Sequence, residues 1–144
     1  KQIETIIPVL DKDGKEQFDI NGKLITEIKI VEQTTIFKAS SKGQLFKTRI
    51  CSTKGSKSAI GCYLGTDKEG RDLVGSLGTG FIYVANKGKN IEIGDYLISS
   101  DVSGYAELQN DDIYRNTTVA KSTDNIIWNI NEKSRLISCI YLGG

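Results

Sequence analysis

Turn-forming residues interrupt this chain at short intervals, about every eight to twelve positions. The clearest signals are Asp13-Gly14 and Asn21-Gly22, because these residue types adopt the positive φ angles of hairpin turns at low cost. Between the turns, isoleucine, valine and threonine total 37 residues, against five alanines and no methionine, which favours strands over helices. We therefore predict an all-β fold, a small barrel or sandwich of about a dozen short strands joined by Gly/Asn/Asp turns, with little or no helix.

Alternating or continuous apolar runs mark the expected strands. They cover residues 16–20, 23–31, 34–39, 44–52, 59–64, 81–85, 91–93, 96–99, 104–108, 117–121, 126–130 and 135–142. The glycine-rich stretch 65–80 is expected to be a turn-rich connection and a place for flexibility. The length matches one ordinary domain, so we predict a single domain over 1–144. It could divide into an N-terminal hairpin subregion at 1–52 and a β core at 59–144.

The composition excludes several classes of function. The chain contains no histidine, so catalysis or metal binding that depends on imidazole is ruled out. Nineteen basic and eighteen acidic residues give a formal net charge of +1, which is not the basic excess of a nucleic-acid-coating protein. No apolar run approaches the length of a membrane span. We therefore expect no nucleic-acid partner, no membrane partner and no cofactor.

The cysteines and carboxylates do not form a recognisable metal or redox motif. Cys51, Cys62 and Cys139 are odd in number, and none lies in a CxxC pair, so we expect buried free thiols in a reducing compartment. The acidic turn at 11–16 lacks the oxygen ligands of a calcium loop. Asp111 and Asp112 could bind a cation together with a third loop carboxylate, but a solvated acidic loop is the commoner case. We expect no metal site.

A distinctive motif lies in the second half of the chain. It consists of the segments IEIGDYLISS (91–100), GYAELQNDD (104–112) and NTTVAK (116–121). The residues that carry the pattern most directly are Ile91, Gly94, Asp95, Tyr96, Gly104, Tyr105, Ala106, Asp111, Asp112, Thr118, Ala120 and Lys121.

On physical grounds alone, we interpret this motif as a structural feature of the fold rather than as a catalytic site. Gly94 should adopt a positive φ in a tight turn, and Asp95 should accept a hydrogen bond from a nearby backbone N–H or hydroxyl. Val119 should point inward on a returning strand. Lys121 should point outward or pair with one of the two aspartates at 111–112. None of these residues is assigned a catalytic role.

The three segments resemble a β-rich C-terminal domain of viral surface, fibre and tail-appendage proteins. This group includes the peptidase G2-like intramolecular-chaperone region of phage and large-DNA-virus appendages. The resemblance covers about forty residues. It implies a structural virion component, made in the host cytoplasm, such as a fibre, spike or minor capsid domain. Its partners would be copies of itself, with a trimer favoured, and other virion proteins.

Two alternatives stay open beside this non-enzymatic role. One is a self-cleaving intramolecular chaperone that trimerises a viral appendage, in which Ser99, Ser100 and Asp101 are the candidates for the cleaving group. A chain that begins at Lys1 rather than methionine is expected of a processed product or of part of a longer protein. The other is a receptor- or glycan-binding fibre tip, although Trp128 fits a core or subunit interface better than a sugar platform.

Overall fold

Nine strands and no helix make up the part of the chain that the computed structural model describes, residues 28–40 and 43–143. The strands are β1 (Ile30–Ser40), β2 (Gly43–Ile50), β3 (Ala59–Thr66), β4 (Asp72–Gly75), β5 (Leu77–Ala85), β6 (Tyr96–Ser99), β7 (Ala106–Leu108), β8 (Thr118–Ser122) and β9 (Ser134–Leu142). The predicted all-β class is confirmed. The expected strand at 16–20, most of that at 23–31 and both hairpin turns before residue 23 lie outside the described residues.

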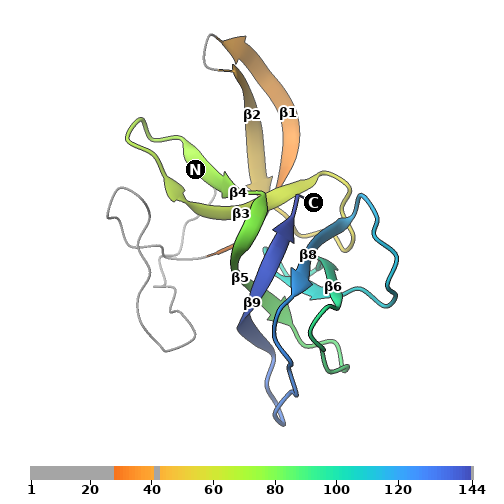
Figure 1. The fold of residues 1–144 in the computed structure, drawn as a ribbon. Helices are drawn as coiled ribbons and strands as arrows, with labels where there is room; N and C mark the ends of the chain where they lie inside the picture. Colours follow the sequence, from red (N-terminus) through yellow and green to blue (C-terminus); the bar gives the residue numbers. More distant parts are fainter. Residues whose placement is uncertain (1–27, 41–42, 144) are drawn as a thin grey trace.

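The strands form a four-stranded sheet and a closed five-stranded barrel (Figure 1). The sheet has the order β2-β1-β3-β4, and the barrel has the order β5-β7-β6-β8-β9. β9 closes the barrel by pairing antiparallel with β5, from Leu77 opposite Leu142 to Ala85 opposite Ser134. A parallel contact joins β5 to β7, where Val84 lies opposite Ala106. The sheet ends at Gly75 and the barrel begins at Leu77, so the change between them falls within the glycine-rich stretch.

Three of the predictions along the chain were wrong. The stretch 65–80 is not a plain connection, because it contains all of β4 and the start of β5. At 91–93 and 126–130, where two strands were expected, there is a single bridge between Ile91 and Ile126. The other isoleucines of these two segments are exposed, so their apolar pattern does not correspond to a face that packs on the core.

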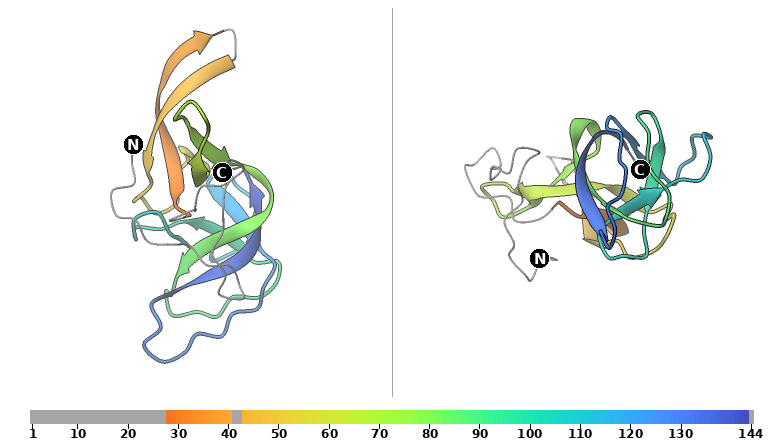
Figure 2. Two further views of the ribbon diagram at one scale, coloured as in Figure 1. Left: turned by 90° about the vertical axis from the view of Figure 1, so that its left-hand side faces the viewer. Right: turned by 90° about the horizontal axis from the view of Figure 1, so that it is seen from below.

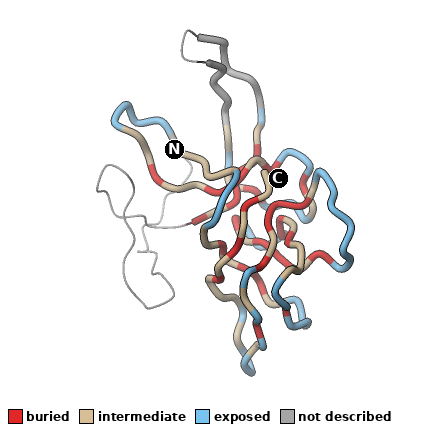
Figure 3. The backbone as a smooth tube through the Cα atoms, viewed as in Figure 1, coloured by how far each residue is buried: buried red, intermediate tan, exposed pale blue. Residues whose placement is uncertain are grey.

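The hydrophobic core of the described residues draws on both the barrel and the base of the sheet, where the buried positions lie in Figure 3. The sheet side contributes Ile30 and Cys62, while Ile82, Leu97 and Ile137 line the barrel. All three cysteines are buried and free, as expected. Burial raises the pKa of the Cys139 thiol to about 12, so it stays protonated at neutral pH.

The β1–β2 hairpin extends well beyond the sheet that it belongs to. β1 pairs with β3 only at Ile30, Val31 and Glu32, whereas its pairing with β2 continues as far as Ser40 opposite Gly43. The outer part of the hairpin, residues 33–40 and 43–48, is therefore a two-stranded ribbon, which we call the ribbon. It projects from the rest of the molecule in two views (Figures 1 and 2).

Candidate functional site

The Gly94-Asp95 turn directly precedes β6, and hydrogen bonds join it to the end of β8. Gly94 has a φ of 95°, and its N–H donates to the Ser122 carbonyl at 2.8 Å. The Asp95 carboxylate accepts a hydrogen bond from the Glu92 N–H at 2.8 Å, and the Asp95 carbonyl accepts one from the Ser122 N–H at 2.8 Å. Both predictions for this turn, the positive φ and the hydrogen-bonded carboxylate, are confirmed.

This geometry sets the expected cost of changing the turn. Gly94→Val should lower the free energy of unfolding by roughly 1–3 kcal/mol, because it places a β-branched residue at a positive φ. Asp95→Asn should cost about 1 kcal/mol, since the amide oxygen remains an acceptor for the Glu92 N–H. Thermal unfolding of both variants measures these costs. An Asp95→Asn variant that is fully stable but stops the cleavage of a longer precursor would contradict the structural role.

Several motif residues are small or buried because neighbouring strands approach them closely. Ala106 is fully buried and lies opposite both Val84 of β5 and Ser99 of β6. Ala120 is also fully buried, between Leu97 of β6 and Tyr141 of β9. Val119 is buried, as expected. These positions belong to the wall of the barrel.

Gly104 and Tyr105 join the barrel to the sheet. Gly104 has a φ of 80°, its N–H donates to the Cys51 carbonyl at 2.6 Å, and its carbonyl accepts from the Ile30 N–H at 2.8 Å. A Cβ atom at this position would collide with the side chain of Lys29. The Tyr105 ring stacks on Tyr83 with centroids 5.3 Å apart, and the Lys29 ammonium lies 4.6 Å from its centre.

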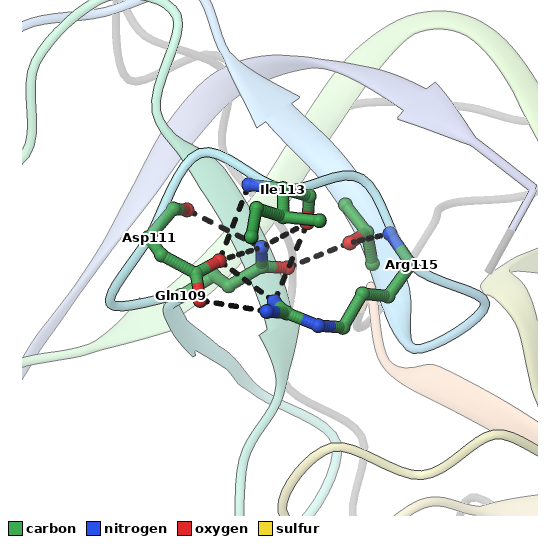
Figure 4. Close-up of polar contacts among 5 residues, drawn as sticks. Gln109, Asp111, Ile113 and Arg115 are labelled. Atoms are coloured by element: carbon green, nitrogen blue, oxygen red, sulfur yellow. Dashed lines mark hydrogen bonds and ion pairs between the residues drawn. The ribbon is translucent and has the colours of Figure 1, made fainter.

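A polar network ties the acidic loop to β8 (Figure 4). Asp111 accepts hydrogen bonds from both terminal nitrogens of Arg115 at 2.7 and 2.8 Å and from the Gln109 amide at 2.9 Å. These bonds hold the pKa of Asp111 well below its usual range. Thr118, fully buried, donates its hydroxyl to the Gln109 side-chain oxygen at 2.6 Å. These bonds fix the conformation of the acidic loop around the Asp111 carboxylate.

A pairing of Lys121 with Asp111, one of the alternatives predicted for Lys121, was therefore wrong. The ion-pair partner of Asp111 among the described residues is Arg115, whose planar guanidinium matches a carboxylate and which lies four positions along the loop. Lys121 instead lies beside the Tyr96 ring, with its ammonium 5.8 Å from the ring centre. Asp112 is exposed.

Removing the Thr118 hydroxyl should destabilise this network. Thr118→Val leaves the buried Gln109 oxygen without its donor and the Arg115 N–H, 3.1 Å from that hydroxyl, without its acceptor. We expect a loss of roughly 1–3 kcal/mol in the free energy of unfolding. Thr118→Ser keeps the hydroxyl and should lose clearly less. Chemical denaturation compares the two, and equal losses would show that the hydroxyl is not responsible.

A second polar cluster surrounds a buried carboxylate that sequence reasoning missed. Glu107 is 2% exposed and accepts the Ser100 hydroxyl at 2.8 Å. Lys54 and Lys87 bring their ammonium groups to 3.2 and 3.8 Å from it, and Lys87 also contacts Asp101 at 2.9 Å. The Asp101 contact raises the pKa of Lys87 and lowers that of Asp101. The available signal was a charged residue in the middle of a three-residue apolar strand.

Hydrogen bonds to neighbouring segments hold the serines of the motif in place. The Ser99 hydroxyl donates to the Thr53 carbonyl at 2.7 Å and accepts the Ser56 N–H at 2.8 Å. Ser99 and Ser100 are both fully buried, whereas Asp101 is exposed. The three candidates for a cleaving group are thus adjacent in the chain but differ in accessibility.

Another buried carboxylate anchors the base of the ribbon. Glu32 is 5% exposed and accepts hydrogen bonds from Arg49 at 2.7 Å and from the Ser56 hydroxyl at 2.8 Å. Burial acts to raise the pKa of Glu32, but the bonds from Arg49 and Ser56 outweigh it, so the pKa is lowered. The charged form of Glu32 is therefore the stable one at neutral pH. Sequence reasoning missed this cluster as well.

One end of the barrel exposes three isoleucines, which we call the isoleucine end. Ile93, Ile127 and Ile130 are 63%, 73% and 93% exposed. Their loops adjoin, because the Ile93 N–H donates to the Asn125 side chain at 2.9 Å and a bridge joins the same two segments. The β8–β9 loop that carries two of them lies at the bottom of Figure 1.

Trp128 lies in the same loop but is half-buried against the core. Its indole N–H donates to the Lys89 carbonyl at 2.8 Å, and the Arg135 guanidinium lies 5.6 Å from its ring centre. The Arg135 side chain in turn pairs with Glu132, which lowers the pKa of Glu132 to about 2. The ring is thus engaged by the protein's own groups.

No group of three acidic or cysteine side chains able to hold a metal ion occurs in residues 28–40 and 43–143. Over the same residues, no helix has the length and apolar character needed to cross a membrane. Comparison of the chain with protein-family models, with curated proteins and with solved structures found no match.

Proposed function

We propose that this chain is a structural domain of a virus particle, acting in assembly through contacts with copies of itself and with other particle proteins. Two things support the proposal: the motif's resemblance to viral fibre and appendage domains, and the isoleucine end of the barrel. A trimer is the favoured form, because the resemblance is to appendage proteins that are commonly threefold.

The isoleucine end carries the proposal. Three large aliphatic side chains, each more than 60% exposed, stand on two loops that hydrogen bonds hold together. Fully burying one such side chain is worth about 1.5–3 kcal/mol. Contiguous exposed apolar surface on a folded protein commonly marks a contact with another protein. A contact surface at this end fits an assembly role better than a substrate site.

Association of the purified chain tests this use of the isoleucine end. We expect the double variant Ile127→Ser/Ile130→Ser to self-associate at least tenfold more weakly than wild type while keeping its thermal stability. Leu77→Ser is the matched control, since Leu77 is 78% exposed but lies outside the two loops. The chain should also be found in purified particles. Unchanged association of the double variant, together with absence from particles, would overturn the proposal.

Self-cleavage is the second candidate, and one observation favours it. The Ser100 hydroxyl is hydrogen-bonded to the Glu107 carboxylate, and the carbonyl of the preceding Ser99 accepts the Gly55 N–H at 2.9 Å. Glu107 could take the hydroxyl proton while the oxygen attacks that carbonyl carbon. Glu107 would then return the proton to the nitrogen as the C–N bond breaks, which leaves an ester and a free amine, and water would hydrolyse the ester.

Intact-mass analysis distinguishes the two functions. Under the structural proposal, a full-length precursor keeps its mass, and Ser100→Ala leaves it unchanged. Self-cleavage predicts two fragments that meet between residues 99 and 100, abolished by Ser100→Ala. Fragments of this kind from the wild-type protein would establish the second candidate.

A further inference from the structure

The acidic loop between β7 and β8 carries a second exposed apolar surface. Ile113 is 60% exposed and Tyr114 is 56% exposed, and we call this pair the tyrosine surface. Seven large hydrophobic side chains are exposed among the described residues, and three of them form the isoleucine end. Of the other four, only Ile113 and Tyr114 are neighbours in the chain. Adjoining apolar side chains that a fold leaves in water commonly mark a contact with another molecule.

The fold holds the tyrosine surface in one conformation. The Tyr114 hydroxyl donates to the Leu142 carbonyl at 3.1 Å. The Ile113 N–H donates to the Asp111 carboxylate at 3.2 Å, and the Ile113 carbonyl accepts the Gln109 amide at 2.7 Å. A surface that is fixed before its partner arrives loses little conformational entropy when the partner docks. The two exposed side chains are therefore presented in a form suited to binding.

The tyrosine surface and the isoleucine end lie at opposite ends of β9. Ile127 and Ile130 are in the loop that leads into this strand, whereas Tyr114 is bonded to Leu142, its last residue. In Figure 1, β9 runs from that loop toward the C-terminus. Its nine residues span roughly 27 Å. One copy cannot bring its own two surfaces together, so a contact between them has to join two copies.

Unpaired charges lie beside both surfaces and have opposite signs. Asp112, next to Ile113, is exposed, and so are Lys89 and Lys133 in the loops of the isoleucine end. None of these three has an ion-pair partner among the described residues. A contact between the surfaces would bring Asp112 toward the lysines, which favours one orientation over others. The isoleucine end also carries Glu92, so we assign charge the orientation of the contact and the apolar side chains its driving force.

We infer that the isoleucine end of one copy docks against the tyrosine surface of a neighbouring copy. This inference rests on the assembly role proposed above and names the surface that the isoleucine end meets. The contact covers all five exposed side chains at once, whereas two isoleucine ends facing each other would leave Ile113 and Tyr114 in water. Contacts between unlike surfaces continue from copy to copy, and they close into a ring when the rotation permits.

Mixing two variants tests the inference. The tyrosine variant is Ile113→Ser/Tyr114→Ser, which keeps the backbone hydrogen bonds of Ile113, and the isoleucine variant is Ile127→Ser/Ile130→Ser. Val102→Ser is the control, because Val102 is 41% exposed and lies outside both surfaces. Tyr114→Phe removes the hydroxyl and keeps the ring. Sedimentation equilibrium measures association, and thermal unfolding confirms that each variant is folded.

We expect the tyrosine and isoleucine variants, each alone, to associate at least about tenfold more weakly than the control. An equimolar mixture of the two should form a complex of two chains and no larger one, because each variant supplies the surface that the other lacks. Tyr114→Phe should associate as wild type does, since the ring makes the contact.

A tyrosine variant that associates as well as the control would overturn the inference, and so would a mixture that forms no complex. Either result, with a wild-type protein that is oligomeric, leaves the assembly role standing. A wild-type protein that is monomeric would overturn the assembly role and the inference together.

Discussion

Gly61→Ala is expected to lower the free energy of unfolding by about 3 kcal/mol. Gly61 lies in the middle of β3, opposite Val31 of β1, with a φ of 148°. A Cβ atom here would overlap the carbonyl oxygen of Gly75 and lie 2.9 Å from a methyl carbon of Val74. Both contacts are with β4, so alanine would force the two strands apart.

The matched control is Gly78→Ala. Gly78 also has a positive φ, 106°, but a Cβ atom there meets no other atom within 4 Å. Its cost should be limited to backbone strain, about 1 kcal/mol. Chemical denaturation of the two variants isolates the effect of crowding. If Gly61→Ala costs no more than Gly78→Ala, then β3 and β4 do not approach as closely as described.

Glu107→Ala should produce the other large loss, about 3 kcal/mol in the free energy of unfolding. The substitution leaves the buried Ser100 hydroxyl without its acceptor and opens a cavity at a position that is 2% exposed. It also removes the carboxylate shared by Lys54 and Lys87, but both lysines reach solvent and can be rehydrated. The loss therefore comes mainly from the buried side of the cluster.

Two further variants separate these contributions. Glu107→Gln keeps an acceptor for the Ser100 hydroxyl and most of the volume, so its cost should fall to about 1 kcal/mol. Glu69→Ala removes an exposed carboxylate that pairs with Arg71 and should change stability by less than about 1 kcal/mol. Calorimetry of Glu107→Ala, Glu107→Gln and Glu69→Ala ranks the three variants by their loss of stability. A Glu107→Ala variant as stable as Glu69→Ala would show that the buried cluster does not support the fold.

The all-β class and the Gly94-Asp95 turn could be predicted because both depend on local chemistry. β-Branched content sets the backbone preference of a segment, and a glycine before an aspartate indicates a tight turn from neighbouring residues alone. Barrel closure has no such local signal. It depends on β9 pairing with β5, some fifty residues earlier, and on a parallel contact at Val84 and Ala106.

The isoleucines at 126–130 show a different limit of sequence reasoning. Their apolar pattern predicted a strand, because alternation usually reflects a face that packs on the core. In the structure Ile126 is buried while Ile127 and Ile130 are exposed in a loop. An isoleucine exposed in a loop and one that packs in the core are the same residue type, so the sequence does not distinguish them.

Glu107 and Glu32 could not be assigned for a related reason. Each is a charged residue in a strand, and a charged residue there normally indicates a solvent-facing position. Both are buried because partners from distant segments, Lys54 for one and Ser56 for the other, supply the compensating groups. Long-range packing of this kind leaves no trace in the spacing of one strand.

The solution mass of the wild-type protein tests the assembly role most directly. Light scattering across a range of concentrations should give a closed oligomer, with three times the mass of one chain as the favoured value. A mass of one chain at every concentration and at low salt would contradict the account.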